Sequence, residues 1–275
     1  MCIIHGRLDD KLAIVSGANA GIGEATVAEL ARGNAVVIMA CRNRDKAEAA
    51  KDQILNLYGV SNSRSVEINV ADPAVKASLS PIKPEQLQKE LLDLGNLQSV
   101  RNFADRFKQA HGSLDYLINN AAIMQSAYGK TVDSHEKVIG VNYLGHFLLT
   151  ELLLLPIKKA TSSRIIFFSS DMHRLGKLHK PDLHIPPAEY GGLKSYRQSK
   201  LAVAICAAEL GRKLTDCGVV AVSAHPGNVR TDLNQGLTTL GFHTRVFFSS
   251  YRYTKDISVV IPVFMNRKSL GFPGV

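Results

Sequence analysis

Residues 12–23, LAIVSGANAGIG, decide the fold of this chain. Residues 12–16 form a short apolar run that predicts a buried strand, and a glycine-rich turn follows it at once. A helical pattern then continues through Val27 and Leu30. The order strand, turn, helix is typical of the first unit of a parallel α/β sheet.

Strand-like and helix-like segments alternate along the rest of the chain. We expect further buried strands at 35–40, 114–118, 164–169 and 219–224, and helices at 42–57, 97–110, 135–155 and 195–214. Residues 66–88 hold three prolines and interrupt the alternation, so we expect a surface insertion there and place the third strand at 89–94. The pattern predicts an α/β fold, with a Rossmann-like doubly wound parallel sheet in a single domain over residues 1–275.

Composition and charge narrow the class of protein. The chain has 275 residues, of which 45% are hydrophobic and 21% charged, which excludes disorder, collagen and coiled coil. The net charge of +9 suits nucleic acid, an anionic membrane surface or a phosphorylated ligand. The 33 basic residues are scattered and form no nucleic-acid-binding motif, so we expect no nucleic-acid partner.

The cysteines and the apolar stretches bear on location. The four cysteines, at 2, 41, 206 and 217, form no CxxC pair, so we expect a reducing compartment, the cytoplasm, and no metal site. The start of the chain lacks the apolar run of a signal peptide. No stretch holds eighteen uncharged apolar residues, so we expect no transmembrane segment.

The glycine turn predicts a nucleotide site. Gly17, Gly21 and Gly23 lie between a strand and a helix, where missing side chains let a pyrophosphate approach backbone N–H groups at the positive helix end. The spacing GxxxGxG differs from the general GxGxxG fingerprint, so a plain tight turn is the alternative.

Arg42 predicts which dinucleotide binds. The position about 20 residues past the glycines carries an acid in proteins that hold a free ribose 2′-hydroxyl, but here the sequence is Met-Ala-Cys-Arg, ending at Arg42. A guanidinium suits a 2′-phosphate, which favours NADP(H) over NAD(H). The alternative is a solvated arginine at a helix start.

Tyr196 and Lys200 stand four residues apart and therefore on one face of the expected helix. A phenol serves as a proton donor and acceptor near neutral pH only when a nearby cation stabilises the phenolate, which Lys200 could do. Such a pair also occurs by chance on many helices.

Several motifs in one order carry a family resemblance: the glycine turn at 17–23, Asn119-Asn120-Ala121-Ala122, Asn142, Ser169-Ser170, Tyr196xxxLys200 and Pro226-Gly227. They resemble the short-chain dehydrogenase/reductase family. The phrases ACRN, VNYLGHFLLT and HPGNVRTDL are similar to its retinol-dehydrogenase-like branch, including the oxidoreductase part of WW-domain oxidoreductases.

The resemblance implies a hydride transfer with Tyr196 as the acid and base. Ser170, with Ser169 as the fallback, would bond the substrate oxygen, Lys200 would lower the Tyr196 pKa and hold the nicotinamide ribose, and Asn142 would anchor a water. The resemblance implies these cofactor-binding residues: Gly17, Asn19, Gly21, Ile22, Gly23, Arg42, Asp93, Leu94, Asn120, Ala121, Ala122, Tyr196, Lys200, Pro226, Gly227, Val229 and Thr231. Asp93 could instead cap a helix, Asn120 could satisfy strand-end groups, and Pro226-Gly227 could be a plain turn.

This sequence departs from the family pattern at four places. Ser16 replaces Thr, Ala122 replaces Gly, the insertion lies near the adenine side, and only 48 residues follow Gly227, where the family continues to another strand. We therefore expect a shortened C-terminal end in 228–275 that acts as a substrate-side flap, with a dimer surface or a weak membrane contact as the alternatives.

The leading hypothesis is an NADP(H)-dependent oxidoreductase that acts on a small apolar alcohol, aldehyde or ketone, such as a retinoid, steroid or lipid carbonyl. A catalytically impaired nucleotide-binding regulatory or interaction protein is the alternative. Histidines 173, 179 and 184 fit no metal pattern, and we interpret them as a polar lid. The absence of GxSxG argues against a hydrolase. A homo-oligomer and peripheral membrane association are compatible with all of these features.

Overall fold

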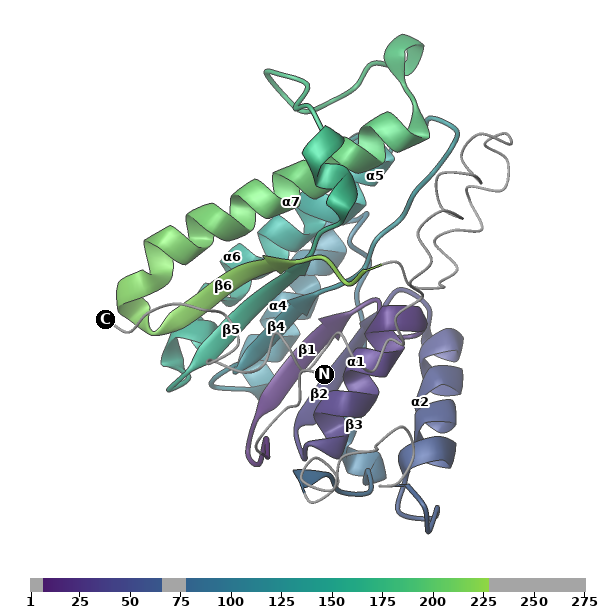
Figure 1. Cartoon of the computed structure of the whole chain (residues 1–275), viewed down its shortest axis with the longest axis vertical. Coiled ribbons are helices and arrows are strands. Elements are labelled where there is room, and N and C mark those ends of the chain that lie inside the picture. The colour runs from purple at the N-terminus through teal and green to yellow at the C-terminus, as the bar shows by residue number, and fades with distance from the viewer. Residues whose placement is uncertain (1–6, 66–77, 228–275) are drawn as a thin grey trace.

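The structure is a computed structural model, and it describes residues 7–65 and 78–227. Six strands form one parallel sheet in the order β3-β2-β1-β4-β5-β6 (Figure 1). The strands are β1 (Leu12–Ser16), β2 (Val36–Cys41), β3 (Leu87–Leu91), β4 (Tyr116–Asn119), β5 (Ser163–Phe168) and β6 (Val219–Ala224). The chain leaves β1 in one direction and later returns to its other side, so the sheet is doubly wound in a single domain, as predicted.

Helices cover both faces of this sheet (Figure 1). The helices are α1 (Gly21–Arg32), α2 (Arg44–Tyr58), α4 (Leu97–Ala110), α5 (Lys137–Ile139), α6 (Gly145–Lys159) and α7 (Gly192–Leu214). Short helical turns occur at Pro84–Gln86, Asp171–Leu175, Pro187–Glu189 and Thr215–Cys217, and a π turn occupies Gly140–Leu144.

Alternate strand residues fill two separate cores. Val15 and Met39 pack with α1 and α2 on one face, whereas Ile14 and Leu117 pack with α4, α6 and α7 on the other. These side chains are buried on both faces, so each central strand is an apolar run rather than an alternating one.

Two expected boundaries need correction. The third strand begins at Leu87 and ends at Leu91, not at 89–94, and it pairs with β2 from Val37 opposite Leu87. Leu87 and Gln88 therefore belong to the sheet and not to the expected 66–88 insertion. Residues 66–77 of that segment, and the expected C-terminal region 228–275, lie outside the described residues.

The expected helix 135–155 is divided in two. The π turn, in which Gly145 N–H bonds the Gly140 carbonyl, separates α5 from α6. By length and composition the segment Lys137–Lys159 is apolar enough to cross a membrane, but 56% of its most apolar window is buried inside the protein. It contacts α4 and the central strands, which explains its apolar sequence as the cover of a sheet.

Candidate active site and cofactor site

The predicted motifs converge at one edge of the sheet. The glycine turn follows β1, Arg42 follows β2, Asp93 follows β3, Asn120 follows β4, and Ser169-Ser170 follow β5. All strands are parallel, so these segments lie at their common carboxyl end. In doubly wound sheets this edge binds the ligand at the point where the strand order reverses, which here lies between β1 and β4.

The glycine turn requires glycine for two reasons. Gly17 and Gly21 have φ of +64° and +56°, in the left-handed region. A Cβ on Gly23 would lie 2.2 Å from the Gly17 carbonyl oxygen and 2.6 Å from Asn120 Nδ2. Ala20, the N-cap residue of α1, makes no side-chain cap, so the first backbone N–H groups of the helix have no side-chain partner from the cap. This cradle fits a phosphate.

Gly23→Ala tests the cradle. The added methyl would force the Gly17 carbonyl or Asn120 to move, so we expect a loss of about 2–4 kcal/mol in unfolding free energy and at least about tenfold weaker NADPH binding. Urea unfolding and NADPH titration measure both. Gly112→Ala is the matched control, because its Cβ would meet nothing within 4 Å. Equal effects of the two substitutions would contradict the cradle.

Ser16 and Asn120 join the turn to the end of β4. The Ser16 hydroxyl accepts the N–H groups of Asn120 and Ala121 at 2.9 and 3.0 Å. Asn120 Nδ2 in turn donates to the Ser16 carbonyl at 2.8 Å. The Ser16 hydroxyl therefore joins the end of β1 to the residues that follow β4. Asn120 holds the glycine turn in place and also borders the site.

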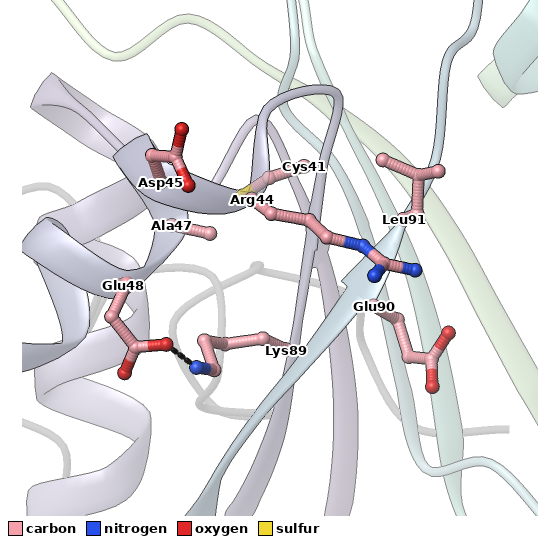
Figure 2. A pocket seen from close by; sticks show the side chains of 8 residues that line it. All are labelled: Cys41, Arg44, Asp45, Ala47, Glu48, Lys89, Glu90 and Leu91. Carbon is pink, nitrogen blue, oxygen red and sulfur yellow. Dashed lines mark ion pairs between the residues drawn. The ribbon is translucent and has the colours of Figure 1, made fainter.

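Arg42 lies between β2 and α2 and is exposed. It precedes the helix, whose N-cap is Asn43, with Asn43 Oδ1 accepting the Lys46 N–H at 2.8 Å. A pocket of about 360 Å³ lies beside this link. Figure 2 shows the Arg44 side chain extending from α2 towards Leu91 of β3. Arg44, a second guanidinium two residues after Arg42, was not predicted from the sequence as a site residue.

Asp93 and Leu94 follow β3. Asp93 Oδ1 accepts the Gly95 N–H at 2.9 Å, which closes a local turn. The cap of α4 is Asn96 and not Asp93, because Asn96 Oδ1 accepts the Ser99 N–H at 3.0 Å. Leu94 is buried in the core, and a Cβ on Gly145 would lie 2.4 Å from its carbonyl oxygen.

Tyr196 and Lys200 lie on the buried face of α7. The Lys200 Nζ lies 5.6 Å from the centre of the Tyr196 ring, so the two side chains are neighbours. The ammonium donates to the Phe168 carbonyl at 2.7 Å. Both residues are more than nine-tenths buried.

The two serines after β5 have different contacts. Ser170 hydrogen-bonds the Tyr196 phenol. Ser169 is buried and donates to the Lys200 carbonyl at 3.0 Å, so its hydroxyl is used by the backbone of α7. The geometry places Ser170, and not Ser169, beside the phenol.

Burial governs the charges at this site. It raises the pKa of Tyr196 to about 12, against the smaller lowering effect of the Ser170 hydrogen bond. It lowers the pKa of Lys200 to about 8. In this arrangement the pKa of Tyr196 is therefore above its ordinary value, opposite to the direction expected from a neighbouring Lys200.

Asn142 lies in the π turn, a distortion that often occurs at functional sites. Its Oδ1 accepts the Ile123 N–H at 2.8 Å, and its Nδ2 donates to the Ile123 carbonyl at 2.9 Å and to Ser199 Oγ at 3.0 Å. Ser199 Oγ donates to the Tyr196 carbonyl at 2.8 Å. Ile123 and Ser199 were not predicted from the sequence. For Ser199, its place between Tyr196 and Lys200 was the available signal.

The remaining predicted segments border the same edge. Gly227 has φ of +83°, and the preceding His225 bonds Asp171 with 3.0 Å between Nε2 and Oδ2. This contact joins the end of β6 to the turn after Ser170. The predicted Val229 and Thr231 lie outside the described residues, whereas Asn19, Ile22 and Ala122 are half-buried there.

The connection between β5 and α7 holds the three histidines and extends beyond the sheet (Figure 1). His173 Nδ1 bonds the Ser170 carbonyl at 2.6 Å, and His184 stacks on His135 with 5.2 Å between ring centres. Across residues 7–65 and 78–227, no three His, Cys, Asp or Glu side chains are grouped to hold a metal ion. The three described cysteines, Cys41, Cys206 and Cys217, are free thiols.

Comparisons with known proteins identify the family of this chain. The short chain dehydrogenase family model matches residues 85–239. Mouse retinol dehydrogenase 11 is 38% identical over 248 residues, covering 90% of this chain and 71% of that protein. Human retinol dehydrogenase 14 is 40% identical over 230 residues, covering 84% of this chain and 65% of that protein. A short chain dehydrogenase from Shigella flexneri, solved with NADP, has a TM-score of 0.67 at 20% identity, covering 95% of this chain and 92% of that one.

The chain therefore belongs to the short-chain dehydrogenase/reductase family of oxidoreductases. Within that family it is of the retinol-dehydrogenase-like branch.

Proposed function

We propose that this protein is an NADP(H)-dependent oxidoreductase of small apolar alcohols, aldehydes and ketones, such as retinoids, steroids or lipid carbonyls. The observation that carries the proposal is the buried contact of Tyr196 with Ser170 at the carboxyl edge of the sheet, beside Lys200. The names of the retinol dehydrogenases support the substrate class, and the NADP complex of a structural neighbour supports the cofactor.

The proposed cofactor site uses the predicted residues. The cradle of Gly17, Gly21 and Gly23 would hold the pyrophosphate at the start of α1. Arg42 would contact the 2′-phosphate, and Asp93 to Leu94 and Asn120 to Ala122 would border the adenosine. Lys200 would hold the nicotinamide ribose, with Pro226 and Gly227 beside the amide. The nicotinamide, when bound, supplies or accepts a hydride.

The chain's own residues would handle the proton. Tyr196 O–H would donate to the substrate oxygen as a carbonyl is reduced and would regain the proton afterwards. Ser170 would orient that oxygen through its hydroxyl, since it already bonds the phenol. Asn142 would hold a water that connects Lys200 to solvent, and its three side-chain hydrogen bonds fix it in place.

Arg42→Asp tests the choice of cofactor. Replacing an exposed guanidinium by a carboxylate would exchange attraction for repulsion at a 2′-phosphate, so we expect NADPH to bind roughly 10–100-fold more weakly and NADH to change little. Fluorescence titration with each cofactor measures this. Arg101→Asp on α4 is a control for net charge. Equal losses with both cofactors would refute the phosphate contact.

A panel of apolar carbonyls tests the function itself. We expect NADPH oxidation with at least one retinoid, steroid or lipid aldehyde, and an increase in Tm on NADPH addition, because a ligand that binds only the folded state stabilises it. A folded protein that binds NADPH and reduces nothing in the panel would favour the regulatory alternative instead.

We also propose cytoplasmic location with peripheral membrane contact, and association of copies. Phe147, Leu155 and Ile205 are 40%, 64% and 49% exposed on α6 and α7, which gives these helices an apolar outer surface. Light scattering measures the association, and vesicle sedimentation measures the membrane contact.

A further inference from the structure

A buried histidine joins the two halves of the proposed site. His146 is the second residue of α6, lies one turn after Asn142 and is only 1% exposed. Its Nδ1 lies 3.0 Å from the Asn142 carbonyl oxygen, and its Nε2 lies 2.8 Å from Ser16 Oγ. Ser16 is the last residue of β1, directly before the glycine turn, so His146 contacts both the cofactor cradle and the π turn that holds Asn142.

The partners of this ring fix where its proton lies. The Asn142 carbonyl can only accept, so Nδ1 carries the hydrogen and Nε2 is the acceptor. The Ser16 hydroxyl already accepts two backbone N–H groups, and its own hydrogen is free to donate to Nε2. The other acceptor for that hydrogen, the Ile118 carbonyl, is farther away at 3.4 Å. With a neutral ring, both ring nitrogens, the Ser16 hydroxyl and the Asn142 carbonyl then all have hydrogen-bond partners.

A neutral ring agrees with its surroundings. The pKa of His146 is lowered to about 4, mainly by complete burial and less by the nearby Lys200, against the raising effect of the hydrogen bond to the Asn142 carbonyl, so the ring stays uncharged at neutral pH. An apolar side chain here would leave the Asn142 carbonyl and the Ser16 hydroxyl without these buried partners. The position therefore demands a group that donates on one side and accepts on the other.

We propose that His146 is a positioning residue that holds Asn142 in register with the cofactor turn. The inference rests on the proposed function. From Asn142 the contacts continue through Ser199 to the backbone of Tyr196. A shift of the π turn would therefore displace Asn142 relative to Tyr196 and Ser16 relative to the cradle, and small displacements of catalytic groups have large effects on rate.

Three substitutions separate the two contacts of the ring. His146→Asn keeps a donor at the Nδ1 position and loses the acceptor for Ser16. His146→Gln keeps an acceptor at the Nε2 position and loses the donor to Asn142. His146→Leu loses both. The control is Thr150→Val, which is on the same helix, fully buried, and loses the 3.0 Å hydrogen bond from Asn119.

The measurements are NADPH Kd without substrate, kcat with the best carbonyl, and Tm. We expect His146→Leu to raise Kd and lower kcat, each by roughly 10–100-fold. His146→Asn should raise mainly Kd, and His146→Gln should lower mainly kcat. Thr150→Val should lower Tm as His146→Leu does but change Kd and kcat by less than about threefold.

Two outcomes would overturn the inference. If all three His146 variants keep the Kd and kcat of Thr150→Val, the ring is only a core residue. If His146→Asn and His146→Gln raise Kd by the same factor and lower kcat by the same factor, the two contacts do not act separately. If the native protein binds NADPH but has no turnover, only the proposed function is contradicted. The comparison of Kd values still decides the role of His146 at the cradle.

Discussion

Tyr196→Phe should reduce carbonyl turnover by roughly 10²–10⁴-fold while the protein stays folded and binds NADPH as the native protein does. The substitution removes the hydroxyl that would donate the proton and keeps the ring, which is buried on α7. It also removes the hydrogen bond with Ser170, so we expect a loss of only about 1 kcal/mol in unfolding free energy. Single-turnover NADPH oxidation, NADPH titration and urea unfolding measure the three quantities.

Tyr190→Phe is the matched control. Tyr190 precedes α7, and its hydroxyl donates to the Gln125 carbonyl at 2.7 Å, so this variant also loses a phenol hydroxyl and one hydrogen bond close to the site. We expect it to keep turnover within a fewfold of the native rate. Tyr196→Phe turnover equal to that of Tyr190→Phe would exclude Tyr196 as the proton donor.

The raised pKa of Tyr196 also predicts different pH dependences for the rates of reduction and oxidation. With a pKa of about 12, the phenol is protonated throughout the neutral range and is ready to donate. Reduction needs the phenol and should be independent of Tyr196 ionisation between pH 6 and 8. Oxidation of an alcohol needs the phenolate and should rise with pH. Initial rates in both directions measure this, and a reduction rate that follows a rising phenolate fraction would contradict it.

The local parts of the fold were predictable from sequence. The bounds of β1 and β6 match the expected 12–16 and 219–224, because each is a short run rich in apolar residues with a clear turn beside it. The glycine turn was also predictable, because its three glycines directly follow the apolar run of β1. Its spacing reflects two positive φ angles and one close approach between residues six apart.

The third strand shows where sequence patterns fail. β3 is an edge strand, and its residues Gln88, Lys89 and Glu90 are polar, so it has no apolar run to mark its start. Leu87, buried at its first position, is the one strong signal, and it lies directly after a proline-containing turn. Partner β2, not local propensity, decides that the strand begins there.

The site was predictable in its residue types and not in its contacts. The spacing of Tyr196 and Lys200 predicts a shared helix face, but not that the ammonium donates to the Phe168 carbonyl, 32 residues earlier in the chain. Likewise the contact of Ser16 with His146 joins residues 130 apart. Periodicity carries no information on such pairs. The π turn was also hidden, because an apolar helical pattern looks alike with or without one extra residue in a turn.

Lys200→Met should abolish turnover and make the protein more stable at neutral pH. The variant removes the group that would hold the nicotinamide ribose, so we expect at least about a thousandfold loss of carbonyl reduction. It also removes a buried ammonium that donates to the Phe168 carbonyl, and a methionine fills similar space without charge. We expect a gain of about 1–3 kcal/mol at pH 7, since a pKa lowered from 10.5 to about 8 reports the cost of burying the charge.

The pH dependence separates this charge effect from packing. Between about pH 8 and 10.5 the unfolded chain holds the Lys200 proton and the folded protein does not, so the free energy of unfolding rises with pH. The penalty for burying the Lys200 charge is fully present below about pH 8 and has disappeared above about pH 10.5. The Tm of the native protein should therefore approach that of Lys200→Met as pH increases through this window. Lys194→Met, which removes an exposed lysine from the same helix, should show no such convergence. A constant Tm difference across the window would mean that the ammonium of Lys200 is not destabilising, and that its burial serves packing alone.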